Sequence, residues 1–177
     1  MDPNDVFSLT KRGDVFRRKG EYKNALTDLD KAIELDPNYA YARCVRGDAY
    51  KEKGEYENAL MDLDKAIKLG QNNAYTLALR GFVYGNRGEY EKALMDLDKA
   101  IELESDNGIA LATRGGVYSG KGEYEKALMD LDKAIKLDPN YDYALAVRDK
   151  VQKELAQASE DSNTMDARTP SSNGPRR

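Results

Sequence analysis

The segment GEYKNALTDLDKAIELDPN occupies residues 20–38 and returns three more times with substitutions. Its opening tripeptide Gly-Glu-Tyr recurs at residues 54–56, 88–90 and 122–124, always 34 residues after the previous copy. A strict period of this length is typical of a repeat protein, in which each unit stacks on its neighbours because it cannot bury its apolar face alone. The fold of one unit therefore predicts the fold of most of the chain.

Each unit contains two helical patterns joined by a glycine. After Gly20, apolar residues fall three and four positions apart, which places them on one face of a helix. They are Ala25, Leu26, Leu29, Ala32 and Ile33. A shorter helical segment precedes Gly20, and glycine adopts without strain the left-handed conformation that ends such a helix. Because proline cannot continue a helix, Pro37 ends the second one, and the unit reads helix, turn, helix, turn.

A second glycine recurs in the middle of the first helix of every unit. Glycine there costs about 1 kcal/mol relative to alanine, so four recurrences indicate that the two helices of a unit approach closely. The glycines are Gly13, Gly47, Gly81 and Gly115, and the small partners expected on the second helices are Ala25, Ala59, Ala93 and Ala127.

This pattern closely resembles the tetratricopeptide repeat family. Its marks are the mid-helix glycine, an aromatic residue three positions later, a small alanine on the second helix, an apolar residue four positions further on and a second alanine. In the second unit these are Gly47, Tyr50, Ala59, Leu63 and Ala66. The resemblance covers about residues 6–141 and implies an all-α fold, a right-handed superhelical solenoid of antiparallel helix pairs.

The period divides the chain into four repeats, a capping helix and a tail. Repeats 1 to 4 are expected at residues 6–39, 40–73, 74–107 and 108–141. Residues 142–158 resemble the first helix of a fifth repeat and are expected to cap the array, with Asp149 in place of the packing glycine. Residues 159–177 lack a periodic apolar pattern, so we expect a disordered tail.

Composition excludes most enzyme chemistries. The chain has no histidine, which removes the commonest general base and metal ligand. Its single cysteine, Cys44, cannot form an internal disulfide or a thiolate zinc site. We therefore expect no enzymatic activity, no catalytic residue, no cofactor and no metal.

Charge and hydropathy exclude two further classes of partner. The formal net charge is −4, and basic and acidic residues alternate along the chain, so nucleic acid is not an expected partner. No apolar run approaches the roughly 20 residues of a membrane helix, and residues 1–5 lack the pattern of a signal peptide. We expect a cytoplasmic protein without a membrane partner.

The resemblance also implies where a protein partner binds, because first helices line the concave groove of the family. The partner-binding positions carried over are Phe7, Asp14, Arg17, Tyr41, Asp48, Lys51, Tyr75, Phe82, Asn86, Ile109 and Tyr143. Five of them open the first helices and the cap, where an apolar residue either packs between repeats or anchors a bound peptide. Additional groove-side glycines, Gly85, Gly116 and Gly120, either leave space for a ligand or reflect a tolerant surface. In both cases the first helix of repeat 4 is expected to be the least stable.

Some members of the family grip the acidic C-termini of cytosolic heat-shock chaperones with a carboxylate clamp of Lys, Asn and Arg. The matching positions in repeats 1 to 3 are Thr10, Asp14, Val45, Tyr75 and Leu79. In repeats 2 to 4 they are Cys44, Asp48, Leu79, Ile109 and Thr113. None is a clamp residue, and an aspartate would repel a carboxylate, so this binding mode is not expected.

An arginine recurs before each mid-helix glycine and once in the cap. These residues are Arg12, Arg46, Arg80, Arg114 and Arg148. Aspartates recur with the same period on the second helices, at positions equivalent to Asp28 and Asp30. We expect ion pairs within the array, and an anion-binding stripe is the alternative.

The function that these patterns favour is a non-enzymatic protein–protein interaction module. As an adaptor, scaffold or complex subunit, it would bind a peptide or helix of another protein in the groove. Self-association into a structural array is the first alternative. An artificial or consensus-derived scaffold is the second, suggested by the near-identical residues 53–69 and 121–137, although the irregular turns and tail speak against deliberate design.

Overall fold

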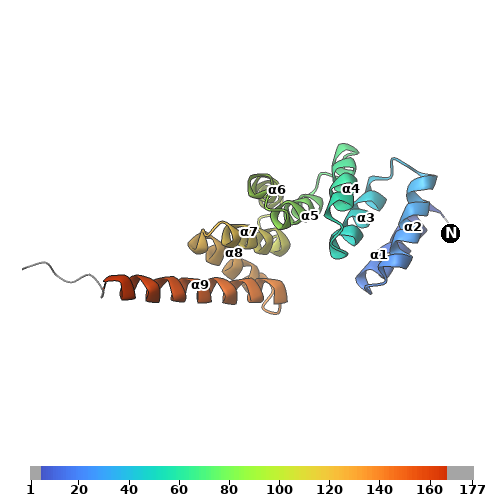
Figure 1. Ribbon diagram of the computed structural model, residues 1–177. Coiled ribbons are helices and arrows are strands. Elements are labelled where there is room, and N and C mark those ends of the chain that lie inside the picture. Colours follow the sequence, from blue (N-terminus) through green and yellow to red (C-terminus); the bar gives the residue numbers. More distant parts are fainter. Residues whose placement is uncertain (1–4, 167–177) are drawn as a thin grey trace, which may run out of the picture.

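The computed structural model describes residues 5–166, with side chains to residue 159, and within that range it contains nine α-helices and no strand (Figure 1). The helices are α1 (Val6–Arg18), α2 (Tyr22–Leu35), α3 (Ala40–Glu52), α4 (Tyr56–Lys68), α5 (Ala74–Asn86), α6 (Tyr90–Leu103), α7 (Gly108–Gly120), α8 (Tyr124–Leu137) and α9 (Asp142–Asp166). Each of α1, α3, α5 and α7 packs on the helix that follows it and on the first helix of the next pair. The result is the predicted solenoid of antiparallel helix pairs.

Glycines with positive φ make the turns within the pairs. Gly20, Gly54, Gly88 and Gly122 all have φ of 75°. At the first of these turns, the backbone N–H of Glu21 donates to the carbonyl oxygen of Phe16 at 2.9 Å, which satisfies a carbonyl at the end of α1. The turn after α4 lacks a proline and uses Gly70, with φ of 96°, together with Asn73, whose side chain caps α5. Left-handed glycine and an N-cap side chain therefore replace proline at that junction.

The mid-helix glycines are contact points, as predicted. A Cβ atom added to Gly13 would lie 2.8 Å from Leu29 Cγ and 3.3 Å from the carbonyl oxygen of Ala25. The three equivalent glycines meet the equivalent leucines of α4, α6 and α8 at 2.7–2.9 Å. The closest partner is therefore a leucine side chain, and the alanine backbone follows it.

The recurring arginines form an arginine ladder, which confirms the prediction of internal ion pairs. Arg46 makes two hydrogen bonds to Asp62 of its own repeat, at 2.6 and 2.8 Å, and one to Asp30 of the preceding repeat at 2.7 Å. The same double linkage connects Arg80 to Asp96 and Asp64, and Arg114 to Asp130 and Asp98. Each of these three arginines thus joins its own second helix to the previous one.

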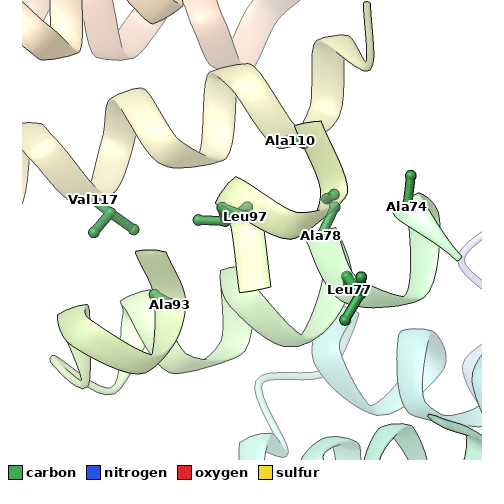
Figure 2. Packing of buried hydrophobic residues seen from close by; sticks show 8 residues of the cluster. Ala74, Leu77, Ala78, Ala93, Leu97, Ala110 and Val117 are labelled. Atoms are coloured by element: carbon green, nitrogen blue, oxygen red, sulfur yellow. The ribbon is translucent and has the colours of Figure 1, made fainter. Parts of the chain in front are cut away.

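Core clusters extend across repeat boundaries. Figure 2 shows one of them, in which Leu97 from α6 lies among small side chains of α5 and α7. Its labelled members are Ala74, Leu77, Ala78, Ala93, Leu97, Ala110 and Val117. The small alanine side chains let helices from successive repeats pack closely, and the cluster crosses the boundary between repeats 3 and 4.

The C-terminal helix is longer than the sequence predicted. Helix α9 continues to Asp166, whereas the capping helix was expected to end at residue 158 and disorder to begin at 159, so that boundary was wrong. Residues 159–166 contain neither glycine nor proline, and the first helix breaker after them is Pro170. The predicted disorder of residues 167–177 lies outside the described residues.

Candidate protein-binding groove

The predicted groove residues fall into two groups along the first helices. The first, here called the polar cluster, joins α1, α3 and the start of α5 and consists of Asp14, Arg17, Asp48, Lys51 and Tyr75. The second, here called the aromatic pocket, lies between α3, α5, α7 and the start of α9.

Asp48 is the centre of the polar cluster. Its carboxylate is buried, with 1% of the residue exposed. The Tyr75 hydroxyl donates to Asp48 Oδ2 at 2.5 Å, and Arg17 Nη1 lies 2.9 Å from the same oxygen. Lys51 Nζ lies 2.8 Å from Oδ1. These groups come from three successive repeats, so the cluster joins the repeats and leaves little of Asp48 or Tyr75 for a partner.

The remaining members of the polar cluster are also engaged. Arg17 donates to Asp14 Oδ1 at 2.8 Å, and both side chains are only 13% exposed. Burial and the nearby Asp48 carboxylate raise the pKa of Tyr75, which therefore stays protonated and keeps donating its hydrogen bond. The sequence placed these residues on the groove side, and the structure shows that they bind one another.

Cys44 lies beside this cluster and is fully buried. Its sulfur is 3.3 Å from Thr76 Oγ1. Burial raises the pKa of the thiol to about 11, which suppresses the thiolate that nucleophilic chemistry requires. Cys44 is therefore a filler of the core.

The aromatic pocket has a volume of about 440 Å³. Its lining residues are Lys51, Glu52, Tyr56, Ala78, Leu79, Phe82, Ile109, Thr113, Tyr141 and Tyr143. The ring centroids of Phe82 and Tyr143 are 6.1 Å apart, and those of Tyr141 and Tyr143 are 6.2 Å apart. A concave, mostly apolar pocket of this size is the usual form of a site that takes a side chain or small ligand.

The additional glycines line a neighbouring cavity of about 120 Å³, which shares Phe82, Thr113 and Tyr143 with the aromatic pocket. A Cβ on Gly116 would lie 2.5 Å from the Tyr143 hydroxyl oxygen, and one on Gly120 would lie 2.9 Å from that of Tyr90. Gly85 faces Val117 Cγ2 at 2.9 Å in the same way. These contacts show that the glycines make room for side chains of the chain itself, and because the same glycines line the smaller cavity, space for a ligand stays a prediction.

The apolar residues that open the first helices do not form a uniform ladder. Phe7 and Ile109 are 48% and 42% exposed. Tyr41, Tyr75 and Tyr143 are partly buried against core clusters that belong mainly to the preceding repeat. The three tyrosines therefore pack between repeats. Anchoring of a bound peptide stays a prediction for Phe7, Ile109 and the accessible faces of the pocket.

Three predicted residues lie at the margins of the groove. Phe7 is at the N-terminal end, where Lys11 Nζ sits 5.5 Å from its ring centroid and 5.0 Å from that of Tyr41. The Asn86 side chain donates to the carbonyl oxygen of Phe82 at 2.9 Å and lines a smaller cavity of about 120 Å³. Phe7 and Tyr41 are thus separate from the aromatic pocket, and Asn86 borders it.

Sequence reasoning missed Tyr56 and Tyr141 as pocket residues. Tyr56 opens a second helix, and Tyr141 lies in the turn before α9, whereas the positional transfer considered first helices alone. The spacing Tyr141-Asp142-Tyr143 repeats that of Tyr39 and Tyr41, and this could have indicated that turn residues join the groove.

Neither a metal-binding cluster nor a membrane-spanning helix occurs among the described residues. Residues 5–159 place no group of three or more His, Cys, Asp or Glu side chains where they could hold a metal ion. Among the described helices, none combines the length and the apolar character that crossing a bilayer requires.

Family models match the chain from residue 13 to residue 141. A "TPR repeat" model matches residues 13–53 and 47–88, and two "tetratricopeptide repeat" models match residues 74–107 and 109–141. No curated protein matches the chain.

Solved structures with the same fold include three that differ in origin. A thermophilic TPR protein of Thermus thermophilus has a TM-score of 0.70 at 25% identity, over 88% of this chain and 84% of that one. MamA protein has a TM-score of 0.66 at 24% identity, over 97% and 98%. The first TPR of Spaghetti (RPAP3), bound to the HSP90 peptide SRMEEVD, has a TM-score of 0.60 at 23% identity, over 68% and 96%. With the matched repeat models and the helix-pair solenoid, these likenesses show that the chain belongs to the tetratricopeptide repeat family.

Proposed function

We propose that this protein binds a segment of another protein, a peptide or a helix, along its first helices, with the aromatic pocket as the anchoring point. The tetratricopeptide fold is that of a protein–protein interaction module. The role that we propose is that of an adaptor, scaffold or complex subunit, because the proposed work is holding a partner without transforming it.

The observation that carries the proposal is the composition of the aromatic pocket. Five helices from successive repeats contribute to it, and three aromatic rings stand close together on its wall. Buried aromatic contacts are typical of the residues that dominate binding energy at protein interfaces. The adjoining polar cluster satisfies its own charges, so the pocket is the part of the groove with unused binding surface.

The proposed binding mode differs from a carboxylate clamp. At the clamp positions, Thr10, Val45 and Leu79 are buried apolar or hydroxyl side chains with at most 4% exposure. Arg17 and Lys51 are cations on the first helices of repeats 1 and 2, and both pair with Asp48. A free carboxylate would have to displace an internal ion pair to bind there. The peptide in the Spaghetti (RPAP3) structure ends in Glu-Glu-Val-Asp, and nothing at these positions of our chain favours such an end.

Peptide selection tests the proposal. Short random peptides displayed on phage are selected on the immobilised chain, and the affinity of enriched peptides is measured by fluorescence anisotropy. The groove variant is Phe82→Ala/Ile109→Ala, which spares the buried Tyr75. The control variant, Met95→Ala/Met129→Ala, removes two apolar side chains that are 65% and 75% exposed on second helices. Circular dichroism checks that both variants stay folded.

We expect the groove variant to weaken binding by at least about tenfold, since truncation of an interface hot spot costs about 2 kcal/mol or more. The control variant should bind like wild type. Equal binding by all three proteins would place the binding surface elsewhere, and failure to enrich any peptide would contradict peptide binding.

One observation favours self-association as a second candidate. Val15 on α1 is 50% exposed, whereas the equivalent Ala49, Val83 and Val117 are at most 4% exposed because a preceding repeat covers them. Arg12 likewise pairs with Asp28 and is 47% exposed. Another helix pair could stack on this face. Light scattering across a concentration series should show a dimer that Val15→Glu abolishes, and a monomer throughout excludes this candidate.

A further inference from the structure

The aromatic pocket adjoins a second hollow at one edge of the groove. This hollow has a volume of about 550 Å³ and shares two lining residues, Ile109 and Tyr141, with the aromatic pocket. Three carboxylates from the turns after α6 and α8 stand around it, and we call them the acidic rim: Glu104, Asp106 and Asp138. An apolar pocket and a ring of carboxylates therefore meet at two side chains.

The acidic rim receives little compensating positive charge. Asp106 is 75% exposed, and its Oδ1 lies 4.0 Å from Lys133 Nζ, which instead donates to the carbonyl oxygen of Ser105 at 2.8 Å. Glu104 accepts a hydrogen bond from the Asn107 amide, and Asp138 accepts one from the backbone N–H of Asn140. Neither of these two donors carries a charge.

The cation at the opposite end of the pocket is already neutralised. Lys51 Nζ lies 2.8 Å from a carboxylate oxygen of Asp48 and 2.8 Å from one of Glu52. Its ammonium also lies 5.4 Å from the centroid of the Phe82 ring. Lys51 is therefore held by two carboxylates within the protein, which reduces its repulsion of a second cation, and the net charge of the chain is −4.

We propose that the bound segment carries an apolar or aromatic side chain, which fills the aromatic pocket, and a Lys or Arg a few residues away, which reaches the acidic rim. This inference rests on the proposed function and names the chemistry of its partner. A basic side chain suits the position because its aliphatic stem covers Ile109 while its charge reaches the carboxylates. The exposed face of Tyr141 adds a cation–π contact.

The peptides enriched in the selection described above are the probes. Each is also synthesised in two altered forms. In the Gln twin every Lys and Arg is replaced by Gln, and in the Glu twin every Lys and Arg is replaced by Glu. The rim variant is Glu104→Lys/Asp106→Lys, because both side chains are exposed, and Glu104 caps the C-terminus of α6 through its backbone N–H, which lysine retains. The matched control is Glu34→Lys/Glu125→Lys, which makes the same change of net charge at exposed positions of α2 and α8, away from both hollows.

We expect most enriched peptides to carry Lys or Arg close to an apolar residue. The rim variant should bind them about five- to tenfold more weakly than wild type, and the control should change affinity by less than about twofold. The Gln twins should lose affinity for wild type but not for the rim variant, because the interaction is then absent in both. Binding of the original peptides should weaken with added salt, and the Glu twins should prefer the rim variant.

Two kinds of result would overturn the inference. The first contradicts only the basic residue of the partner, and the second also contradicts the proposed function. If peptides lose affinity for Phe82→Ala/Ile109→Ala but bind the rim variant like wild type, the prediction of a basic residue in the partner is wrong, whereas the proposal of binding in the groove is retained. Enrichment of peptides without Lys or Arg leads to the same conclusion. If the peptides bind the groove variant as tightly as wild type, both the function and its partner chemistry fail.

Discussion

The substitution Gly81→Ala tests whether packing explains the mid-helix glycines. A Cβ at this position would lie 2.7 Å from Leu97 Cγ, 3.0 Å from Leu97 Cδ2 and 3.2 Å from the carbonyl oxygen of Ala93. Leu97 is fully buried, so it has little room to move. Alanine gains about 1 kcal/mol of helix propensity, whereas overpacking costs about 1–3 kcal/mol and a backbone contact adds to it. We expect a net loss of about 1–2 kcal/mol of unfolding free energy.

Gly108→Ala is the matched control. Gly108 opens α7, and an added Cβ there meets no heavy atom within 4 Å, so we expect unchanged stability or a gain of up to about 1 kcal/mol. Urea unfolding followed by far-UV circular dichroism measures both variants, with the slope of the transition compared to check that its cooperativity is unchanged. If Gly81→Ala is as stable as wild type, or if both variants shift equally, the packing explanation is refuted.

Three further predictions follow from burial and charge. Arg80→Met leaves Asp96, which is 3% exposed, without its cation, so urea unfolding should show a loss of about 3 kcal/mol. Arg148→Met, whose Nη1 lies 3.7 Å from Asp132, should cost less than about 1 kcal/mol, and equal losses would contradict the ladder. Burial raises the pKa of the Cys44 thiol from 9.0 to about 11, so the thiol stabilises the fold at neutral pH and loses this effect as the pH rises through that window. From about pH 8 to about pH 10, wild type should lose about 1 kcal/mol more than Cys44→Ala in paired urea titrations, and identical losses would contradict the shift. Hydrogen exchange should be faster in α7 than in α3 or α5, because α7 contains four glycines, and equal protection would contradict this.

The repeat period made the helix pairs and their contacts predictable. Each unit must bury the same apolar stripe, so one interpretation of residues 20–38 applied to all four repeats. The ion pairs followed from the same logic, since Arg46 and Asp62 recur with equal spacing and must meet in every unit if they meet in one. Contacts between residues that recur with the repeat period also recur in the structure, and the period alone was enough to predict them.

The aromatic pocket could not be predicted in this way, because it is not periodic. Phe82 and Tyr143 belong to repeat 3 and the cap, and their rings meet because the solenoid curves between them. The role of Gly116 became clear only from the position of Tyr143, which lies against it. The length of α9 was missed for a different reason: residues after 158 lack an apolar stripe, but they also lack a helix breaker.

The polar cluster explains why the pocket forms where it does. Alanine–leucine packing is nearly identical at every repeat junction, so it does not distinguish one junction from another. Asp48, in contrast, binds Arg17 from α1 and Tyr75 from α5, and this occurs once in the described array. A buried ion pair adds little net stability over apolar packing, and we infer that the hydrogen bonds of Asp48 instead fix how α1, α3 and α5 are rotated against one another. Because the same carboxylate holds Lys51, whose ammonium faces Phe82, the cluster positions one wall of the aromatic pocket. The charged and the aromatic parts of the groove are therefore one structure, in which the first shapes the second.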